Sequence, residues 1–180
     1  MDETKLLDGR LVVTTGDITK MKTGAVVNAA NSSLMGGGGV DGAIHRGGGP
    51  AILEECKQIR ASRYPDGLPT GQAVATTAGN LPAEHVIHTV GPVWHGGDSG
   101  EADKLAGCYQ RSLEEAAKLS LKDIAFPAIS TGIYGYPKKK AGQVAFKAVR
   151  EFLASSKLPE TVYFVFYSPV DARIFIDTVA

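Results

Sequence analysis

The chain has 180 residues, of which 43% are hydrophobic and 21% charged, and 19 Lys and Arg balance 19 Asp and Glu. This composition is typical of a soluble globular protein, and the length predicts one domain over residues 1–180. Zero net charge argues against broad electrostatic binding to nucleic acid or to a membrane surface. No apolar run is long enough to span a membrane, which takes about 18 residues, and the first residues do not read as a signal peptide. The two cysteines are far apart and are expected to be reduced thiols, which indicates a cytoplasmic protein.

Short runs of apolar or β-branched residues alternate along the chain with segments whose apolar residues recur at helical spacing. The short runs predict strands over 11–15, 25–30, 72–78, 86–90, 124–129 and 161–167. The helical patterns lie at 50–60, 102–119, 142–153 and 169–179. Several strands are apolar throughout, as expected where helices cover both faces of a sheet. The alternation therefore predicts an α/β sandwich with a mixed, largely parallel central sheet.

Between residues 36 and 49, the chain places eight glycines among fourteen residues. Glycine loses much backbone entropy on folding, so such a run is typical of a place where a ligand approaches the main chain closely. The run follows the strand at 25–30 and leads into a predicted helix, an arrangement that can cradle a phosphate. A second loop of small residues, 130–137, follows another strand, so the two loops together indicate a diphosphate. Three polar residues in or just before the first tract, Asn31, Asp41 and His45, are candidates for the chemistry.

Other kinds of site fit the sequence poorly. Residues 37–42 match the glycine pattern of a dinucleotide-binding Rossmann fold, but five residues, 31–35, separate the glycine tract from the strand and no acid ends the next strand. The tract also lacks the Gly-Lys-Ser/Thr of a P-loop. His85 and His88 point to opposite sides of their strand, which makes a poor metal pair, and neither cysteine has a reactive context. We therefore expect no metal, no cofactor and no covalent intermediate.

Five segments of the chain resemble the macrodomain family, most closely its MacroD-type branch, which includes the bacterial O-acetyl-ADP-ribose deacetylases. They read GDIT at 16–19, VNAAN at 27–31, GGGGVDGAIH at 36–45, IHTVGPVW at 87–94 and FPAISTGIYGYP at 126–137. The segments follow the family's order and cover nearly the whole chain. The resemblance implies a three-layer α/β/α domain that binds ADP-ribose. It also implies an enzyme that removes ADP-ribose from acidic side chains and deacetylates O-acetyl-ADP-ribose without a metal.

The resemblance gives a role to each polar residue near the glycine tract, and each role has a structural alternative. Asp41 would orient or deprotonate the attacking water near the distal ribose, or it would cap a helix. His45, four residues later, would shape the distal ribose site, or it would be a hydrogen-bonded structural histidine. Asn31 would hydrogen-bond the distal ribose, or it would only stabilise a turn. These three are the expected catalytic residues, and Asn28 would hold the loop.

The resemblance also implies contacts with the rest of ADP-ribose, from the adenine to the diphosphate and the distal ribose. Asp17 would accept the adenine amino group beside the backbone of Ile18, or it would cap a helical turn over 18–20. Tyr167 would stack on adenine, or it would lie in the core. Main-chain groups of the two loops would hold the distal ribose and the diphosphate, and Tyr134 would cover the cleft. The expected substrate-binding residues are Asp17, Ile18, Asn28, Gly37, Gly38, Gly39, Val40, Ser130, Thr131, Gly132, Ile133, Tyr134 and Tyr167.

The sequence departs from the family pattern at Gly47-Gly48-Gly49, where relatives usually carry alanine in the first one or two positions. Two glycines in place of two alanines cost about 1–2 kcal/mol in a helix. We therefore expect the helix that carries Asp41 to be short or mobile at its end.

The leading hypothesis is a cytoplasmic ADP-ribosyl hydrolase with O-acetyl-ADP-ribose deacetylase activity. Its partners would be ADP-ribose, O-acetyl-ADP-ribose and mono-ADP-ribosylated proteins, with nucleic acid only as an ADP-ribosylated substrate, and the protein would be a monomer. The alternative is a reader module that binds ADP-ribose without turning it over. Readers commonly lack part of the set formed by Asn31, Asp41 and His45, whereas this chain has all three.

Overall fold

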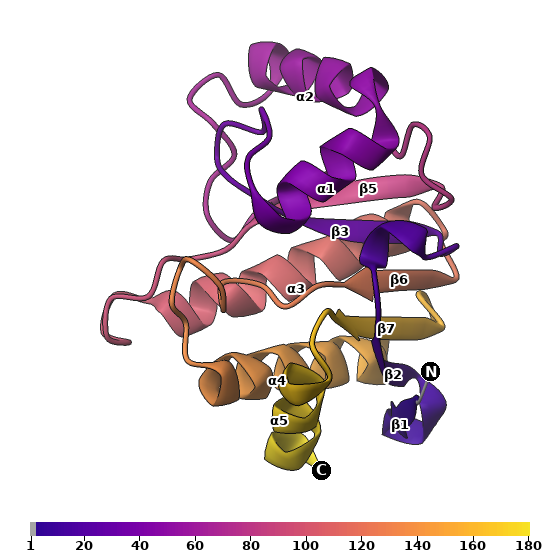
Figure 1. The fold of residues 1–180 in the computed structure, drawn as a ribbon, viewed down its shortest axis with the longest axis vertical. Helices are drawn as coiled ribbons and strands as arrows, with labels where there is room; N and C mark the ends of the chain where they lie inside the picture. Colours follow the sequence, from indigo (N-terminus) through magenta and orange to yellow (C-terminus); the bar gives the residue numbers. More distant parts are fainter. Residues whose placement is uncertain (1–2) are drawn as a thin grey trace.

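The computed structural model describes residues 3–180, and their strands form one seven-stranded sheet (Figure 1). The strand order is β1-β2-β7-β6-β3-β5-β4. The five strands from β2 to β5 in this order run parallel, and β1 and β4 pair antiparallel at the two edges. The prediction of a mixed, largely parallel sheet is confirmed. The strands are β1 (Thr4–Leu6), β2 (Leu11–Thr15), β3 (Ala25–Ala30), β4 (Ala73–Thr77), β5 (His85–Val90), β6 (Asp123–Phe126) and β7 (Thr161–Phe166).

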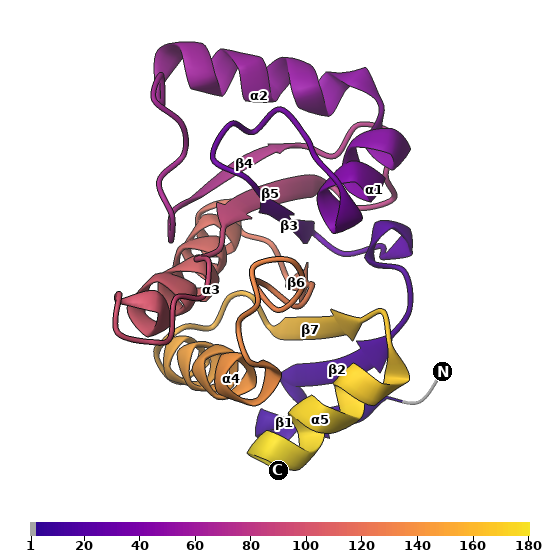
Figure 2. The ribbon, with the colours of Figure 1, turned by 60° about the vertical axis from the view of Figure 1, so that its left-hand side comes forward.

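Helices cover both faces of the sheet, so the fold has three layers (Figures 1 and 2). One face carries α1 (Gly39–Gly48) and α2 (Pro50–Ser62), and the other carries α3 (Glu101–Lys118), α4 (Lys138–Ser155) and α5 (Pro169–Val179). Two 3-10 turns, η1 (Leu7–Gly9) and η2 (Ile18–Lys20), flank β2. Among residues 3–180, no helix combines the length and the apolar character needed to cross a bilayer.

The period-two alternation of β3 divides the apolar core between the two layers of helices. Ala25 and Val27 belong to the core beneath α3, α4 and α5, whereas Val26 and Ala30 belong to the core beneath α1 and α2. The same period places Asn28 on the α1/α2 face, where it is fully buried. A polar side chain buried in an apolar layer needs hydrogen-bond partners, and α1 supplies one of them.

The predicted boundaries of β2, β3 and α5 agree with the structure, and the other predicted elements differ from it by a few residues at their ends. Strand β6 ends at Phe126, because residues 127–129 leave the sheet and lead into the second small-residue loop. Helix α1 continues through Gly47 and Gly48 and ends at Gly49, whose φ of +79° does not fit a helix. The helix is therefore not shortened before its glycines, and mobility at its end stays a prediction. The three-residue strand β1 was not predicted.

Candidate functional site

A cavity of about 260 Å³ opens at the carboxyl ends of β3, β5 and β6. Because these strands are parallel neighbours, the loops that follow them meet at one edge of the sheet. The glycine tract and the 130–134 loop both line this cavity. Of the predicted site residues, it brings together Asn31, Gly37, Gly38, Gly39, Val40, Asp41, Ser130, Gly132, Ile133 and Tyr134.

Asp41 lies in the first turn of α1, and only 5% of its surface is exposed. Its Oδ1 accepts a hydrogen bond of 2.8 Å from Asn28 Nδ2, and His45 Nε2 lies 3.4 Å from the same oxygen. A negative charge in the first turn of a helix interacts favourably with the helix dipole. The residue at the cap position is Gly38, so the capping alternative for Asp41 was wrong. Asp41 instead lines the cavity.

The side chain of Asn31 is held in one orientation by its own loop. Its Oδ1 accepts hydrogen bonds from the backbone amide of Ser33, at 3.0 Å, and from the Ser33 hydroxyl. Its Nδ2 donates to the carbonyl of Gly36 at 3.0 Å. Arg60 ties this loop to α2, because its Nη1 donates to the carbonyl of Ser33 at 2.8 Å. Asn31 therefore does stabilise a turn, and one of its two amide hydrogens remains for a ligand.

Gly37 leaves a small space in the cavity wall between Asp41 and Asn31. A Cβ at this position would lie 3.2 Å from Asp41 Oδ2 and 3.3 Å from Asn31 Nδ2. The carboxylate oxygen and the amide nitrogen therefore face the same point in front of the Gly37 backbone. A water placed there is within hydrogen-bond reach of both atoms. A side chain at residue 37 would fill that position.

Behind Asp41, a row of buried polar side chains crosses the sheet, and its inner members were missed by the sequence analysis. Asn28 Nδ2 lies 3.1 Å from Nδ1 of His88, its Cα partner on β5, and His88 Nε2 lies 2.9 Å from Thr76 Oγ1 on β4. Burial, with a smaller effect of nearby His45, lowers the pKa of His88 to about 3, so the ring is neutral at pH 7. The sequence did contain a signal for His88, because a histidine whose side chain points inward from an apolar strand needs a buried polar partner.

The second loop begins at Ser130, whose backbone has a φ of +68°. A non-glycine residue in this conformation costs about 1–3 kcal/mol. The buried Ser130 hydroxyl has no hydrogen-bond partner among residues 3–180. A Cβ on Gly91 would collide with this hydroxyl, so glycine is needed at the end of β5. The Tyr134 carbonyl accepts a 2.8 Å hydrogen bond from the Trp94 amide, which holds the far end of the loop.

The N-terminus of α1 opens onto the same cavity. In the described part of the chain, no side chain forms a capping hydrogen bond to it. Its first turn, with Gly37 and Gly38 before it, lines the cavity wall. Uncapped amides at the start of a helix, together with the helix dipole, attract anions. The cavity thus has two main-chain walls suited to phosphate groups, this one and the 130–134 loop.

Asp17, Ile18 and Tyr167 lie beyond the cavity, at the carboxyl ends of the parallel neighbours β2 and β7. Asp17 Oδ1 accepts from the hydroxyl and the amide of Thr19, at 2.6 and 3.0 Å, which lowers the pKa of Asp17 and confirms that it caps η2. Tyr167 is 91% exposed, so the core alternative for this residue was wrong. Strand spacing puts β2 about 14 Å from β3, which leaves room for a long ligand along this edge.

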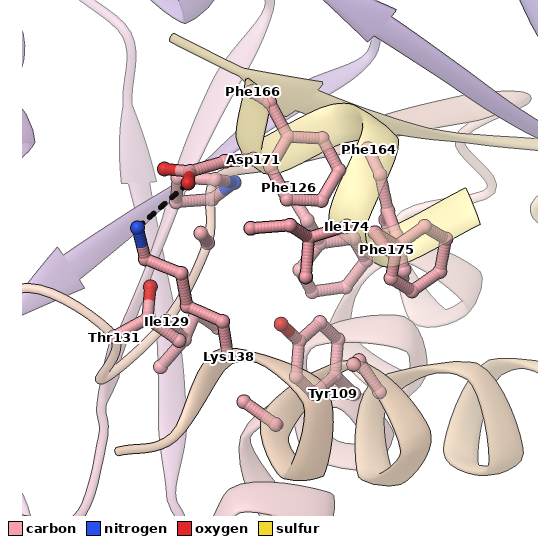
Figure 3. Close-up of a pocket in the computed structure, with 15 residues that line it drawn as sticks. Tyr109, Phe126, Ile129, Thr131, Lys138, Phe164, Phe166, Asp171, Ile174 and Phe175 are labelled. Carbon is pink, nitrogen blue, oxygen red and sulfur yellow. Dashed lines mark hydrogen bonds and ion pairs between the residues drawn. The ribbon is translucent and has the colours of Figure 1, made fainter. Parts of the chain in front are cut away.

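Thr131 lines a different cavity, on the α3/α4/α5 face of the sheet (Figure 3). This second cavity holds about 40 Å³, which is room for about one or two waters, so it is a packing gap and not a nucleotide site. Lys138 and Asp171 form an ion pair of 2.7 Å beside it. Because Thr131 lines this second cavity, only its main chain remains available for the predicted contact with the substrate. Aromatic rings form much of the wall, from Tyr109, Phe126, Phe164, Phe166 and Phe175.

The glycines that end α1 have different packing environments. A Cβ on Gly48 would collide with Ile52 Cδ1 and would lie 3.2 Å from the carbonyl oxygen of Ala78. A Cβ on Gly47 would approach only the flexible end of Leu81, at 3.0 Å from Cδ2. Gly48 therefore permits the close approach of the end of α1 to α2 and to the segment that follows β4. Gly47 is the position where glycine mainly costs helix propensity.

A family model described as Macro domain matches residues 27–145. The chain belongs to the macro domain family. The resemblance found in the five sequence segments is thus confirmed. This macrodomain is 55% identical over 159 residues to a "Macro domain-containing protein" of Methanosarcina mazei, with 88% of this chain and 82% of the relative covered. It is 52% identical over 166 residues to a protein of Escherichia coli strain K12 named "O-acetyl-ADP-ribose deacetylase", with 92% and 93% covered.

Solved structures of macrodomains match the whole fold. A mutant of the Oceanobacillus iheyensis macrodomain with ADPR has a TM-score of 0.92 and 39% identity, covering 99% of this chain and 96% of the other. The Trypanosoma brucei macrodomain in complex with ADP-ribose has a TM-score of 0.86 and 36% identity, covering 96% of this chain and 70% of the other. The three-layer fold of this macrodomain is therefore the fold of its family.

Proposed function

We propose that this macrodomain is an ADP-ribose-binding hydrolase that deacetylates O-acetyl-ADP-ribose and removes mono-ADP-ribose from acidic side chains. The observation that carries the proposal is the space in front of Gly37, which Asp41 Oδ2 and Asn31 Nδ2 both face. The name of the Escherichia coli relative, 52% identical over nearly the whole chain, supports it. The ligands named for the two structural relatives support ADP-ribose as the common part of the substrates.

Asp41 orients the attacking water and takes its proton. Asn28 holds Oδ1, which leaves Oδ2 to accept a hydrogen bond from the water. A positioned general base of this kind contributes about 10²–10⁴-fold to the rate. Asn31 directs its remaining N–H to the distal ribose and so places the susceptible bond against the water. His45 lies beside the carboxylate and shapes the same end of the site.

Both substrates are esters between the distal ribose and a carboxylic acid, so one reaction serves both. The water oxygen forms a bond to the carbonyl carbon of the ester, and the bond from that carbon to the ribose oxygen breaks. The proton that Asp41 takes from the water is returned to the departing group. The products are a free ribose hydroxyl and a free acid, which is acetate in one case and a protein side chain in the other.

The rest of ADP-ribose follows the carboxyl edge of the sheet. The uncapped amides of α1 and the 130–134 loop hold the diphosphate, and the unpaired Ser130 hydroxyl gains a partner in a ligand oxygen. Asp17 accepts the adenine amino group through Oδ2, because Thr19 occupies only Oδ1. Exposed Tyr167 covers the base.

The test is incubation with O-acetyl-ADP-ribose and, separately, with a glutamate-linked mono-ADP-ribosylated protein. Chromatography follows ADP-ribose over time, and calorimetry measures the affinity for ADP-ribose. Release from both substrates that scales with protein concentration is the expected result. Tight binding with no release from either substrate would contradict the hydrolase and identify a reader module. Release from only one substrate would remove the other from the proposal.

A further inference from the structure

Four buried polar side chains form a continuous row from the sheet to the cavity. They come from four elements: Thr76 from β4, His88 from β5, Asn28 from β3 and Asp41 from α1. None of them exposes more than 5% of its surface, and apolar side chains make up the rest of this core. Buried polar groups are costly unless each finds a partner, so a row of four needs a consistent set of donors and acceptors.

The direction of each hydrogen bond in the row follows from the chemistry of the groups. Thr76 Oγ1 lies 2.9 Å from both the Thr77 carbonyl oxygen and His88 Nε2, so its one hydrogen can go to either of them. Asp41 Oδ1 is a carboxylate oxygen that can only accept, so the Asn28 atom beside it is the amide nitrogen, whose second hydrogen meets His88 Nδ1. The neutral ring therefore carries its proton on Nε2, and Nδ1 is an acceptor. Asn28 Nδ2 has two hydrogens, and it donates one to His88 Nδ1 and the other to Asp41 Oδ1.

We propose that His88 is a positioning residue for Asp41, acting through Asn28, an inference that rests on the proposed function. The Nδ1 acceptor of His88 fixes the Asn28 amide so that its second N–H meets Asp41 Oδ1. The reversed amide would direct its oxygen at both His88 Nδ1 and the carboxylate, which is repulsive at each contact. Asp41 is thereby held with Oδ2 toward the space in front of Gly37. His88 touches no substrate and needs no proton transfer.

The decisive variant is His88→Leu, which keeps an apolar side chain in the core and removes the acceptor. Asn28 then has an unpaired N–H, and Asp41 Oδ1 loses its fixed partner. Misplacing a catalytic group by about 1 Å costs about 10²-fold, so we expect kcat to fall at least 10-fold. The KM for O-acetyl-ADP-ribose and the affinity for ADP-ribose should change less than about 3-fold. His88→Asn restores an acceptor at the Nδ1 position and should recover most of kcat.

The matched control is Thr89→Val. Thr89 follows His88 on β5 and is equally buried, but its hydroxyl donates to the Gln72 carbonyl, on the opposite face of the sheet from Asp41. This variant should lower the melting temperature and leave kcat unchanged. If His88→Leu keeps wild-type kcat, or if it lowers kcat no more than Thr89→Val does, the inference is overturned.

A spectroscopic measurement on the wild-type protein tests the same arrangement without turnover. Long-range ¹H–¹⁵N NMR of the histidine rings should show His88 neutral, with its proton on Nε2, from pH 5 to pH 8. A proton on Nδ1 would overturn the inference even if the variants failed to fold. A wild-type protein with no hydrolase activity would instead refute the proposed function. Active wild type with an unaffected His88→Leu variant would refute only the role of His88.

Discussion

Gly37→Ala tests the geometry of the reaction centre with one methyl group. The added carbon would lie 3.2 Å from Asp41 Oδ2 and 3.3 Å from Asn31 Nδ2, inside ordinary van der Waals contact. A water that bridges these two atoms needs about 3 Å to each, so the methyl group takes its position. The backbone at residue 37 does not have a positive φ, so alanine is accommodated without conformational strain.

We expect Gly37→Ala to lower kcat about 10²-fold, which corresponds to about 2.7 kcal/mol in the activation free energy. Steady-state kinetics with O-acetyl-ADP-ribose measures kcat, and thermal unfolding checks that the variant is folded. The matched control is Gly38→Ala, because among the described residues a Cβ at Gly38 meets no atom within 4 Å. Its kcat should stay within about 3-fold of wild type, with any effect confined to KM. A folded Gly37→Ala protein with wild-type kcat would refute the assigned position of the water.

Three further predictions concern stability, pH and the adenine end. Gly48→Ala should destabilise the protein by about 1–3 kcal/mol through overpacking, whereas Gly47→Ala should be neutral or stabilise it by up to about 1 kcal/mol, as denaturant titration would show. Backbone amides of the 95–99 loop donate hydrogen bonds to Glu101 and lower its pKa from 4.5 to about 2. The ionised Glu101 carboxylate therefore stabilises the folded protein fully above pH 4.5, and this stabilisation is lost as the pH falls from 4.5 to 2. Glu101→Gln should therefore flatten the pH dependence of unfolding in that window. Asp17→Asn keeps an oxygen for capping but puts an NH₂ where adenine needs an acceptor, so calorimetry should show ADP-ribose binding about 10-fold weaker.

Each of these predictions has an outcome that contradicts it. Equal stability of the two α1 glycine variants would mean that the end of the helix relaxes and that Gly48 is not required by packing. An unchanged acid unfolding curve in Glu101→Gln would mean that the carboxylate does not hold the 95–99 loop. Unchanged affinity in a folded Asp17→Asn protein would place adenine elsewhere.

The sequence predicted the fold well where one physical pattern dominated. Strands β2 and β3 are apolar runs buried on both faces, and their bounds were predicted without error. The continuation of α1 through its glycines was not predicted, because helix propensity counts Gly47 and Gly48 only as a cost. At Gly48, close packing against the backbone carbonyl of Ala78, 30 residues further along the chain, favours glycine although helix propensity does not. Such a contact between segments is not visible in the local sequence.

The candidate site could be predicted as far as single residues and loops allow. The glycine tract, Asn31 and Asp41 were found from residue type and position, and the structure brings them into one cavity. The support behind Asp41 was not found, because His88 lies 60 residues from Asn28 and meets it only through the parallel pairing of β3 and β5. Pairing register is a property of the sheet as a whole.

The most direct test of the account is Asp41→Asn, which keeps the shape of the side chain and the Oδ1 acceptor for Asn28 but removes the base. Turnover of O-acetyl-ADP-ribose and binding of ADP-ribose are measured on the same preparation, beside wild type. We expect a kcat at least about 10²-fold lower, with the dissociation constant for ADP-ribose changed less than about 3-fold. Wild-type turnover by the Asn variant, or loss of binding in a folded protein, would contradict the role of Asp41 as the base.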